Sequence, residues 1–176
     1  MKLRIAVLAA ALACGLCLTP NARAATTGTS AVTLGASANG ILQVLDPTFN
    51  LIPTAFDYGN DFVEATGAAG LRVRLKSNSS TGCVLYVRCG DASPQIALAD
   101  LLFKTQTAPG TGGSSVTTYT AITASDQALW STGVAQISFV EVDTDVRVQN
   151  LFAYPDAMAA GTTNYTDNLT YTVVAQ

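Results

Sequence analysis

The amino-acid sequence predicts an all-β protein, a two-sheet antiparallel β-sandwich of about seven to ten strands. Stretches rich in β-branched and aromatic residues recur between turn signals along the chain. After the first 24 residues, no long segment carries apolar residues at helical spacing. Only 12% of the residues are charged and 14 are glycines, a composition that suits short strands joined by polar turns.

Individual strands are predicted where β-branched and aromatic residues lie between turn signals. In chain order, the predicted strands are Ala31–Ala36, Gly40–Leu45, Phe62–Ala65, Leu71–Ser77, Cys83–Cys89, Ile96–Phe103, Val116–Ile122, Ala135–Val140, Val142–Val148 and Asn168–Ala175. The glycine-rich segment 108–115 is predicted to be a loop. It is not a phosphate-binding loop, because no Gly-Lys-Ser/Thr follows its glycines and no helical pattern begins there.

The N-terminus has the features of a secretory signal peptide. Lys2 and Arg4 precede an apolar run from Ile5 to Leu18, and the small-residue triplet Ala22-Arg23-Ala24 follows. We expect cleavage directly after this triplet, that is, a signal peptide over residues 1–24. The apolar run is shorter than the roughly 20 residues that a membrane-spanning helix needs, so we expect no membrane span.

The exported part, residues 25–176, is long enough for a single domain with a hydrophobic core. Three of the nine basic residues lie in the signal peptide, so six remain against twelve acidic residues and the net charge is near −6. Such a charge argues against binding to nucleic acids or anionic membranes. We expect the protein in the periplasm, on the cell surface or outside the cell. A lipid anchor on Cys14 is an alternative, because residues 11–14 loosely resemble a lipoprotein cleavage box.

Two neighbouring strands are predicted to form a hairpin. In Leu71–Ser77 and in Cys83–Cys89 the residue type alternates, so each strand turns one side to the core. A five-residue turn between them would place Arg72 opposite Arg88. Like charges in that position destabilise a sheet, so we expect a carboxylate nearby or a slightly different register.

The stretch Ile137–Val148 changes the parity of its apolar residues, which predicts a bulge or a break near Phe139. Glu141, Asp143 and Asp145 are then expected to project together on the side away from the core. They could help to bind calcium, but positions two apart on a strand are about 6.6 Å from each other, too far to share one ion without loop ligands. The alternative is a solvated acidic face or a set of counter-charges for the basic residues of the predicted hairpin.

The chain contains no histidine, which excludes Ser-His-Asp and Cys-His nucleophile arrangements and removes the commonest transition-metal ligand. A pair of carboxylates could still hydrolyse a glycosidic bond, but no Asp/Glu pair stands out by its setting. We therefore expect no catalytic residues, no cofactor and no metal site.

Cys83 and Cys89 are the cysteines of the exported part. A pair in an oxidising compartment suggests a disulfide. However, six residues of extended strand span roughly 20 Å, and a disulfide needs Cα atoms within about 7 Å. Either the strand is broken between the two cysteines, or both are free thiols on the core side.

Aromatic residues could form a platform for a sugar ring. Trp130 and Tyr86 are the candidate residues, and Tyr86 could belong to a cluster with Tyr119 and Tyr154. The alternative for Trp130 is a place in the core, since its neighbours in the sequence are apolar.

Several motifs together resemble the secreted β-sandwich subunits of surface fibres, namely the spore coat protein U and chaperone-usher pilin type. Phe56-Asp57-Tyr58-Gly59 is close to the Phe-Gly motif that ends an early strand in such domains, and Leu71–Leu75 is followed by Cys83–Cys89. The segment 160–167 leads into Leu169–Val174 and resembles their Gly-x-Tyr-x-Asp approach to a last strand. The cysteine that those domains carry in their first strands is absent here.

The resemblance implies an immunoglobulin-like or pilin-like sandwich that lacks one strand, which the N-terminal segment of a neighbouring subunit supplies. Here residues 25–38 are the candidate donor, with Val32, Leu34 and Ala36 as alternate plugs. The alternative is that the same residues form the domain's own first strand. The implied partners are other copies or other fibre subunits, with a periplasmic chaperone before assembly.

The function expected from the sequence is therefore an exported structural or adhesive subunit of an extracytoplasmic assembly, without catalysis. The alternative is a monomeric secreted module that binds carbohydrate or cell-wall polymer.

Overall fold

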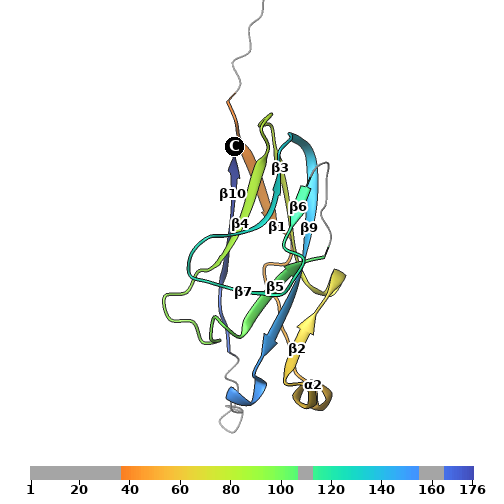
Figure 1. The fold of residues 1–176 in the computed structure, drawn as a ribbon, viewed down its shortest axis with the longest axis vertical. Helices are drawn as coiled ribbons and strands as arrows, with labels where there is room; N and C mark the ends of the chain where they lie inside the picture. Colours follow the sequence, from red (N-terminus) through yellow and green to blue (C-terminus); the bar gives the residue numbers. More distant parts are fainter. Residues whose placement is uncertain (1–36, 107–112, 155–164) are drawn as a thin grey trace, which may run out of the picture. The chain divides into compact units, whose positions relative to one another are not determined.

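We describe residues 37–106, 113–154 and 165–176 of a computed structural model (Figure 1). This part of the chain forms strands, one short α-helix and two 3-10 helices. The strands are β1 (Gly40–Val44), β2 (Phe62–Ala65), β3 (Leu71–Ser77), β4 (Cys83–Cys89), β5 (Leu101–Thr105), β6 (Gly113–Ser115), β7 (Thr120–Ala121), β8 (Gln127–Thr132), β9 (Gln136–Gln149) and β10 (Leu169–Ala175). The helices are α2 (Ala55–Asn60), η1 (Gly67–Ala69) and η2 (Leu151–Ala153). The predicted strand Ala31–Ala36 lies outside the described residues.

The strands form two antiparallel sheets. The first sheet has the order β1-β3-β9-β5-β7, with β2 also paired to β9, and the second has the order β10-β4-β8-β6. Each strand pair in both sheets is antiparallel. The predicted all-β class and two-sheet antiparallel sandwich are therefore confirmed.

The core lies between the two sheets and draws on both. Its fully buried side chains include Val73 and Leu75 of β3, Val142 of β9, Leu85 and Val87 of β4, and Leu129 and Trp130 of β8. Complete burial of one such aliphatic side chain contributes about 1.5–3 kcal/mol. The strict alternation of burial along β3, in which every second residue is buried, is what the sequence pattern predicts.

The predicted hairpin between Leu71–Ser77 and Cys83–Cys89 is wrong, although both strands have the predicted bounds. β3 pairs with β1 and β9 in the first sheet, whereas β4 pairs with β10 and β8 in the second. Residues 78–82 therefore carry the chain from one sheet to the other. Alternation shows which side of a strand faces the core, but it is the same for strands that pair and for strands that face each other across a core.

The crossing connection requires glycine at its last position. Gly82 has a φ of +92°, which L residues with a side chain rarely adopt. A Cβ atom there would also overlap the backbone carbonyl oxygen of Thr132, at the end of β8. Close approach of the connection to β8 thus depends on the missing side chain.

The contact expected between Arg72 and Arg88 does not occur, because the two residues belong to different sheets. Arg72 forms an ion pair with Asp46 at 3.0 Å and lies 3.6 Å from Glu141, while Arg88 lies 3.4 Å from Asp126. Hydrogen bonds from Arg72 lower the pKa of the Asp46 carboxyl. Each arginine therefore has the nearby carboxylate that the sequence analysis expects, in its own sheet.

β9 confirms the predicted bulge. Its residues Gln136–Gln149 form one strand where two were predicted, and the register with β3 shifts between Leu75 and Ser77. This shift places the extra residues of β9 around Phe139. From Val142 onward every second residue of β9 is buried, so the bulge restores a continuous core side.

Glu141 and Asp145 share one side of β9, as predicted, but they lie beside basic residues of two different neighbouring strands, which favours the counter-charge alternative over calcium. Glu141 is exposed beside Arg72. Asp145 is buried, lies 3.3 Å from Lys104 and accepts a hydrogen bond from the Gly67 amide at 2.9 Å. Within the described ranges, no cluster of three or more acidic residues or cysteines could hold a metal ion. These carboxylates act as counter-charges, as the other alternative expects.

Several elements differ from the sequence analysis. β6 (Gly113–Ser115) lies within the predicted loop 108–115, and of the predicted strand Val116–Ile122 only Thr120–Ala121 forms a strand, β7. Phe56-Asp57-Tyr58-Gly59 lies in α2 and does not end a strand; Thr54 and Asp57 form a reciprocal capping box at the start of this helix. β8 was not predicted. A helix of six residues is too short for periodicity to reveal it, and β8 buries its consecutive residues Leu129 and Trp130, which hides the alternation.

Candidate functional site

Within the described residues, strand β10 lies at one end of the second sheet and pairs only with β4. The two strands are in continuous register from Leu169 opposite Cys89 to Ala175 opposite Cys83. The core-facing residues of β4, which are Cys83, Leu85, Val87 and Cys89, are at most 2% exposed. Their register partners on β10 are only half-buried; they are Ala175, Val173, Tyr171 and Leu169. The core side of β10 is therefore partly open to solvent.

Strand β1 shows the same feature at the end of the first sheet, where β3 is its only partner in the part of the chain that the structure describes. Val44 lies opposite Val73 in register and Leu42 lies opposite Leu75. Val73 and Leu75 are fully buried, whereas Val44 is 45% exposed and Leu42 is half-buried. A core-facing apolar residue is thus exposed on this strand too.

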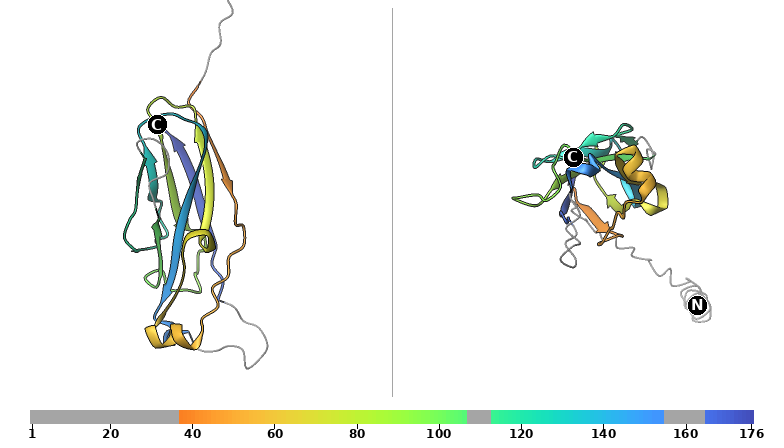
Figure 2. Two further views of the ribbon diagram at one scale, coloured as in Figure 1. Left: turned by 90° about the vertical axis from the view of Figure 1, so that its right-hand side faces the viewer. Right: turned by 90° about the horizontal axis from the view of Figure 1, so that it is seen from below.

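β1 and β10 lie side by side along one side of the sandwich without pairing with each other (Figure 2). They meet at one end, where a Cβ atom on Gly40 would lie 3.1 Å from Cγ1 of Val173. We call this side of the sandwich the open side, because the core-facing residues of the two strands are incompletely buried there, and we define it by these residues. These residues are Gly40, Leu42 and Val44 of β1 and Leu169, Tyr171, Val173 and Ala175 of β10.

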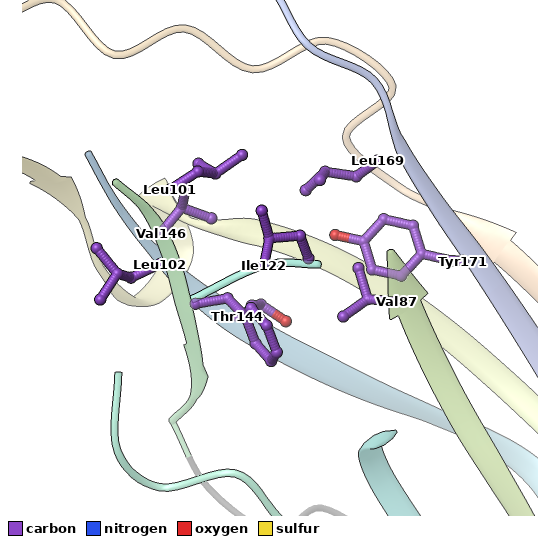
Figure 3. Close-up of a pocket in the computed structure, with 9 residues that line it drawn as sticks. Val87, Leu101, Leu102, Ile122, Thr144, Val146, Leu169 and Tyr171 are labelled. Atoms are coloured by element: carbon purple, nitrogen blue, oxygen red, sulfur yellow. The ribbon is translucent and has the colours of Figure 1, made fainter. Parts of the chain in front are cut away.

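A small cavity of about 10 Å³ lies between the sheets beside the open side (Figure 3). Leu169 and Tyr171 of β10 line it on one side, and the Tyr171 hydroxyl points toward Ile122. Burial raises the pKa of Tyr171, and the Asp46 carboxylate raises it further. Thr144 also lines the cavity, and its buried hydroxyl has no hydrogen-bond partner in the described part of the chain. The volume is about that of one water molecule.

Trp130 and Tyr86 do not form the predicted aromatic platform. Trp130 is 1% exposed and belongs to the core, so its ring cannot receive a sugar. Tyr86 is half-buried and lies opposite Thr172 of β10, on the side of the second sheet away from the core. Because Trp130 faces the core and Tyr86 faces away from it, the two rings do not form one surface.

The structure also separates the other tyrosines of the predicted cluster. Tyr119 donates a hydrogen bond to Glu64 at 2.9 Å. Tyr154 donates to Asp100 at 2.7 Å, and its ring packs edge-on against Tyr165. Burial, followed by these hydrogen bonds to carboxylates, raises the pKa of Tyr119 and of Tyr154 to about 12. Both phenols thus serve as structural hydrogen-bond donors.

Cys83 and Cys89 are free and buried at the two ends of β4. Both face the core, which agrees with the alternative of two free thiols. Burial raises the pKa of the Cys83 thiol, so this cysteine is held in its unreactive protonated form. The candidate donor residues Val32, Leu34 and Ala36 lie outside the described residues.

Two surfaces were missed by the sequence analysis. One is the open side, because alternation in Leu169–Ala175 indicates a strand but not that the strand is an edge. The other lies where α2 meets η2, where the rings of Tyr58 and Phe152 are 5.5 Å apart and Phe152 is 76% exposed. Exposed aromatic residues in two separate segments are visible in the sequence, but their pairing depends on the fold.

No protein family matches the chain, and no curated protein or solved structure matches it either. Among the described residues, no helix has the length and apolar character needed to cross a membrane. The open side and the cavity beside it are therefore interpreted from their own geometry.

Proposed function

We propose that this chain is an exported, non-catalytic structural or adhesive subunit of an extracytoplasmic assembly, in which a β-strand from another subunit fills the open side. One observation carries the proposal: the core-facing residues of β10 are only half-buried, while their register partners on β4 are at most 2% exposed. The same contrast between β1 and β3 supports it. In the described part of the chain, one side of the sandwich is therefore only partly covered.

An added strand would supply that cover by two kinds of contact. The edge of β10 that faces away from β4 offers backbone amides and carbonyls to a new neighbour, as in β-augmentation. Alternate apolar side chains of the new strand would pack onto Leu169, Tyr171 and Val173. Val32, Leu34 and Ala36 have the required alternation, since polar residues or glycine lie between them. In the periplasm, a chaperone would protect the open side before assembly.

The test is the size of the exported full chain, measured by size-exclusion chromatography with light scattering. We expect oligomers for the wild type and monomers for Leu34→Asp, because a charge at a plug position cannot be buried without a partner. Thr33→Asp, one position away and of opposite parity, is the matched control and should still form oligomers. A monomeric wild type, or equal oligomers for both variants, would refute the proposal.

A second candidate function is the binding of carbohydrate or cell-wall polymer. The exposed pair of Tyr58 and Phe152 favours it, since aromatic rings at the surface can stack on sugar rings. Retention of the protein on insoluble cell-wall polysaccharide should then fall in Phe152→Ala. Ile137→Ala removes an equally exposed apolar side chain from β9 and is the control. Equal retention of both variants and the wild type would exclude this surface.

A further inference from the structure

Most of the basic side chains of residues 25–176 form ion pairs. This part of the chain contains six basic residues, all within the described ranges. The four that pair with a carboxylate are Arg72, Arg88, Lys104 and Arg147. The other two, Arg74 and Lys76 of β3, form no ion pair with any described residue. An otherwise acidic chain therefore keeps two uncompensated positive charges on one strand.

Both of these cations lie over the same aromatic ring. The guanidinium carbon of Arg74 is 4.8 Å from the centre of the Phe139 ring, and Nζ of Lys76 is 4.9 Å from it. The register of β9 with β3 shifts between Leu75 and Ser77, so the bulged residues of β9 come to lie opposite Lys76. Contact with a ring holds a cation in place but does not neutralise its charge. Both charges thus remain available to an anion.

Strand β1 extends this surface on the other side of β3. Ile41 lies opposite Lys76 and is 45% exposed, while Gln43 lies opposite Arg74. Oε1 of Gln43 accepts a hydrogen bond from Nε of Arg74 at 2.6 Å. This bond orients the guanidinium and leaves its two terminal nitrogens without a hydrogen-bond partner among the described residues.

Together these side chains form one surface on the side of the first sheet away from the core. We call it the basic strip, and its residues are Ile41, Gln43, Arg74, Lys76 and Phe139. It crosses the three neighbouring strands β1, β3 and β9. Strands about 4.8 Å apart make such a strip about 10 Å long across the sheet. Its two cations thus lie between an exposed aliphatic side chain and a partly exposed ring.

The chemistry of the basic strip matches an acidic polysaccharide. A guanidinium and an ammonium group pair with carboxylates, and the planar guanidinium can hold one carboxylate through two parallel hydrogen bonds. The apolar C–H groups of a sugar ring pack against aromatic and aliphatic side chains. A chain of uronic acids presents a carboxylate and an apolar ring face on each unit. The strip presents the complementary groups side by side.

Broader partners fit the basic strip less well. A stable protein interface uses about 20–30 residues on each side, far more than the strip offers. A membrane surface would also contact acidic residues next to the strip. Glu141 lies opposite Arg74 in register, with its carboxylate 3.6 Å from Arg72, and Asp46 pairs with Arg72 from the other side. A single polymer chain can follow the strip without covering these carboxylates.

We propose that the basic strip binds a linear acidic polysaccharide, in which Arg74 and Lys76 pair with carboxylates and Ile41 and Phe139 contact the sugar rings. The inference goes beyond the proposed function, since it names a ligand and does not depend on strand addition. The strip also differs from the Tyr58–Phe152 surface: Phe139 lies near the first residue of β9, whereas Phe152 follows its last.

The test is binding of the exported full chain to polygalacturonate, measured by isothermal titration calorimetry. Methyl-esterified polygalacturonate has the same rings without the charges and should bind at least about tenfold more weakly. Lys76→Gln and Arg74→Gln should each raise the Kd for polygalacturonate about fivefold. Arg88→Gln removes the same charge from the second sheet, where Asp126 pairs with it, and should leave the Kd unchanged.

Two further measurements sharpen the test. Phe139→Leu keeps an apolar side chain but removes the ring that holds both cations, so it should also raise the Kd for polygalacturonate. Added salt should weaken binding of the wild type more than binding of Lys76→Gln, since exposed charges are screened over about 8 Å at physiological ionic strength. Thermal unfolding of each variant checks that it is folded.

Several outcomes would overturn the inference. Equal losses in Arg88→Gln and in the two strip variants would mean that net charge alone sets the affinity. Equal binding of the charged and the esterified polymer would exclude a role for the two cations. No binding of polygalacturonate by the folded chain, or binding only to vesicles of phosphatidylglycerol, would exclude the polysaccharide. Each of these results leaves strand addition at the open side intact, because the strip faces away from the core.

Discussion

Strands β4 and β10 are neighbours in one sheet and have similar patterns, yet their core-facing sides differ. Both alternate apolar core-facing residues with others, and they are paired over seven residues. The core-facing residues of β4 are at most 2% exposed, whereas those of β10 are only half-buried. The difference arises because, among the described residues, β4 has a neighbouring strand on both sides and β10 has one. The same alternation therefore contributes to stability in the middle of the sheet and leaves apolar side chains partly exposed at its edge.

The largest expected effect compares two partners in one register position, Leu85 of β4 and Val173 of β10. Leu85→Ala should lower the free energy of unfolding by about 2–5 kcal/mol, since it leaves a cavity in a sealed core. Val173→Ala should cost about 1 kcal/mol or less, because the valine is already partly exposed. Urea denaturation of both variants measures the two values. Similar losses at the two positions would show that β10 is as well covered as β4.

The next prediction applies the comparison to the first sheet, where Val73 of β3 lies opposite Val44 of β1. Val73→Thr buries a hydroxyl group among apolar side chains and should cost about 1–3 kcal/mol. Val44→Thr places the same group where water can reach it and should change stability by less than about 0.5 kcal/mol. Chemical denaturation at neutral pH checks both. A large loss in Val44→Thr would contradict an exposed edge on β1.

The smallest effect concerns Tyr171, whose pKa is raised by burial. In the unfolded chain a tyrosine loses its proton near pH 10, whereas the folded protein keeps it to higher pH. Loss of the proton therefore favours the unfolded chain, so the free energy of unfolding has its full value below about pH 10 and falls as the pH rises above it. Tyr171→Phe removes this dependence, so between pH 9 and 11 the variant should lose less stability than the wild type, by at most about 1.4 kcal/mol per pH unit.

Urea unfolding of Tyr171→Phe and the wild type at the two pH values gives this difference. Tyr119 and Tyr154, which also have a raised pKa, are unchanged in the comparison and contribute equally to both proteins. Parallel loss of stability in the two proteins would mean that the Tyr171 phenol is solvated on the open side.

Much of the strand content could be read from the sequence. The bounds predicted for Phe62–Ala65, Leu71–Ser77 and Cys83–Cys89 are those of β2, β3 and β4, and the bulge near Phe139 is present. These features depend on residue types at neighbouring positions. The segment Asn168–Ala175 was likewise predicted as a strand in the sheet, and β10 covers Leu169–Ala175 of it.

The candidate site could be predicted only in part. The sequence offered Trp130 as an exposed platform or as a core residue, and β8 places it in the core. It suggested strand addition but not the acceptor, because nothing in Leu169–Val174 shows that this strand has a single neighbour. The contacts of Arg74 and Lys76 with the Phe139 ring join strands that are far apart in the chain and have no local signal.

By itself, the sequence determined the all-β class, most of the strands and the side of each strand that faces the core, since a period of two is a property of the local chain. The tertiary structure decided which strands pair, which of them are edges and where the sandwich is open. These features depend on contacts between distant segments: the chain crosses to the other sheet after Ser77, and β1 and β10 each have one neighbouring strand in the described ranges.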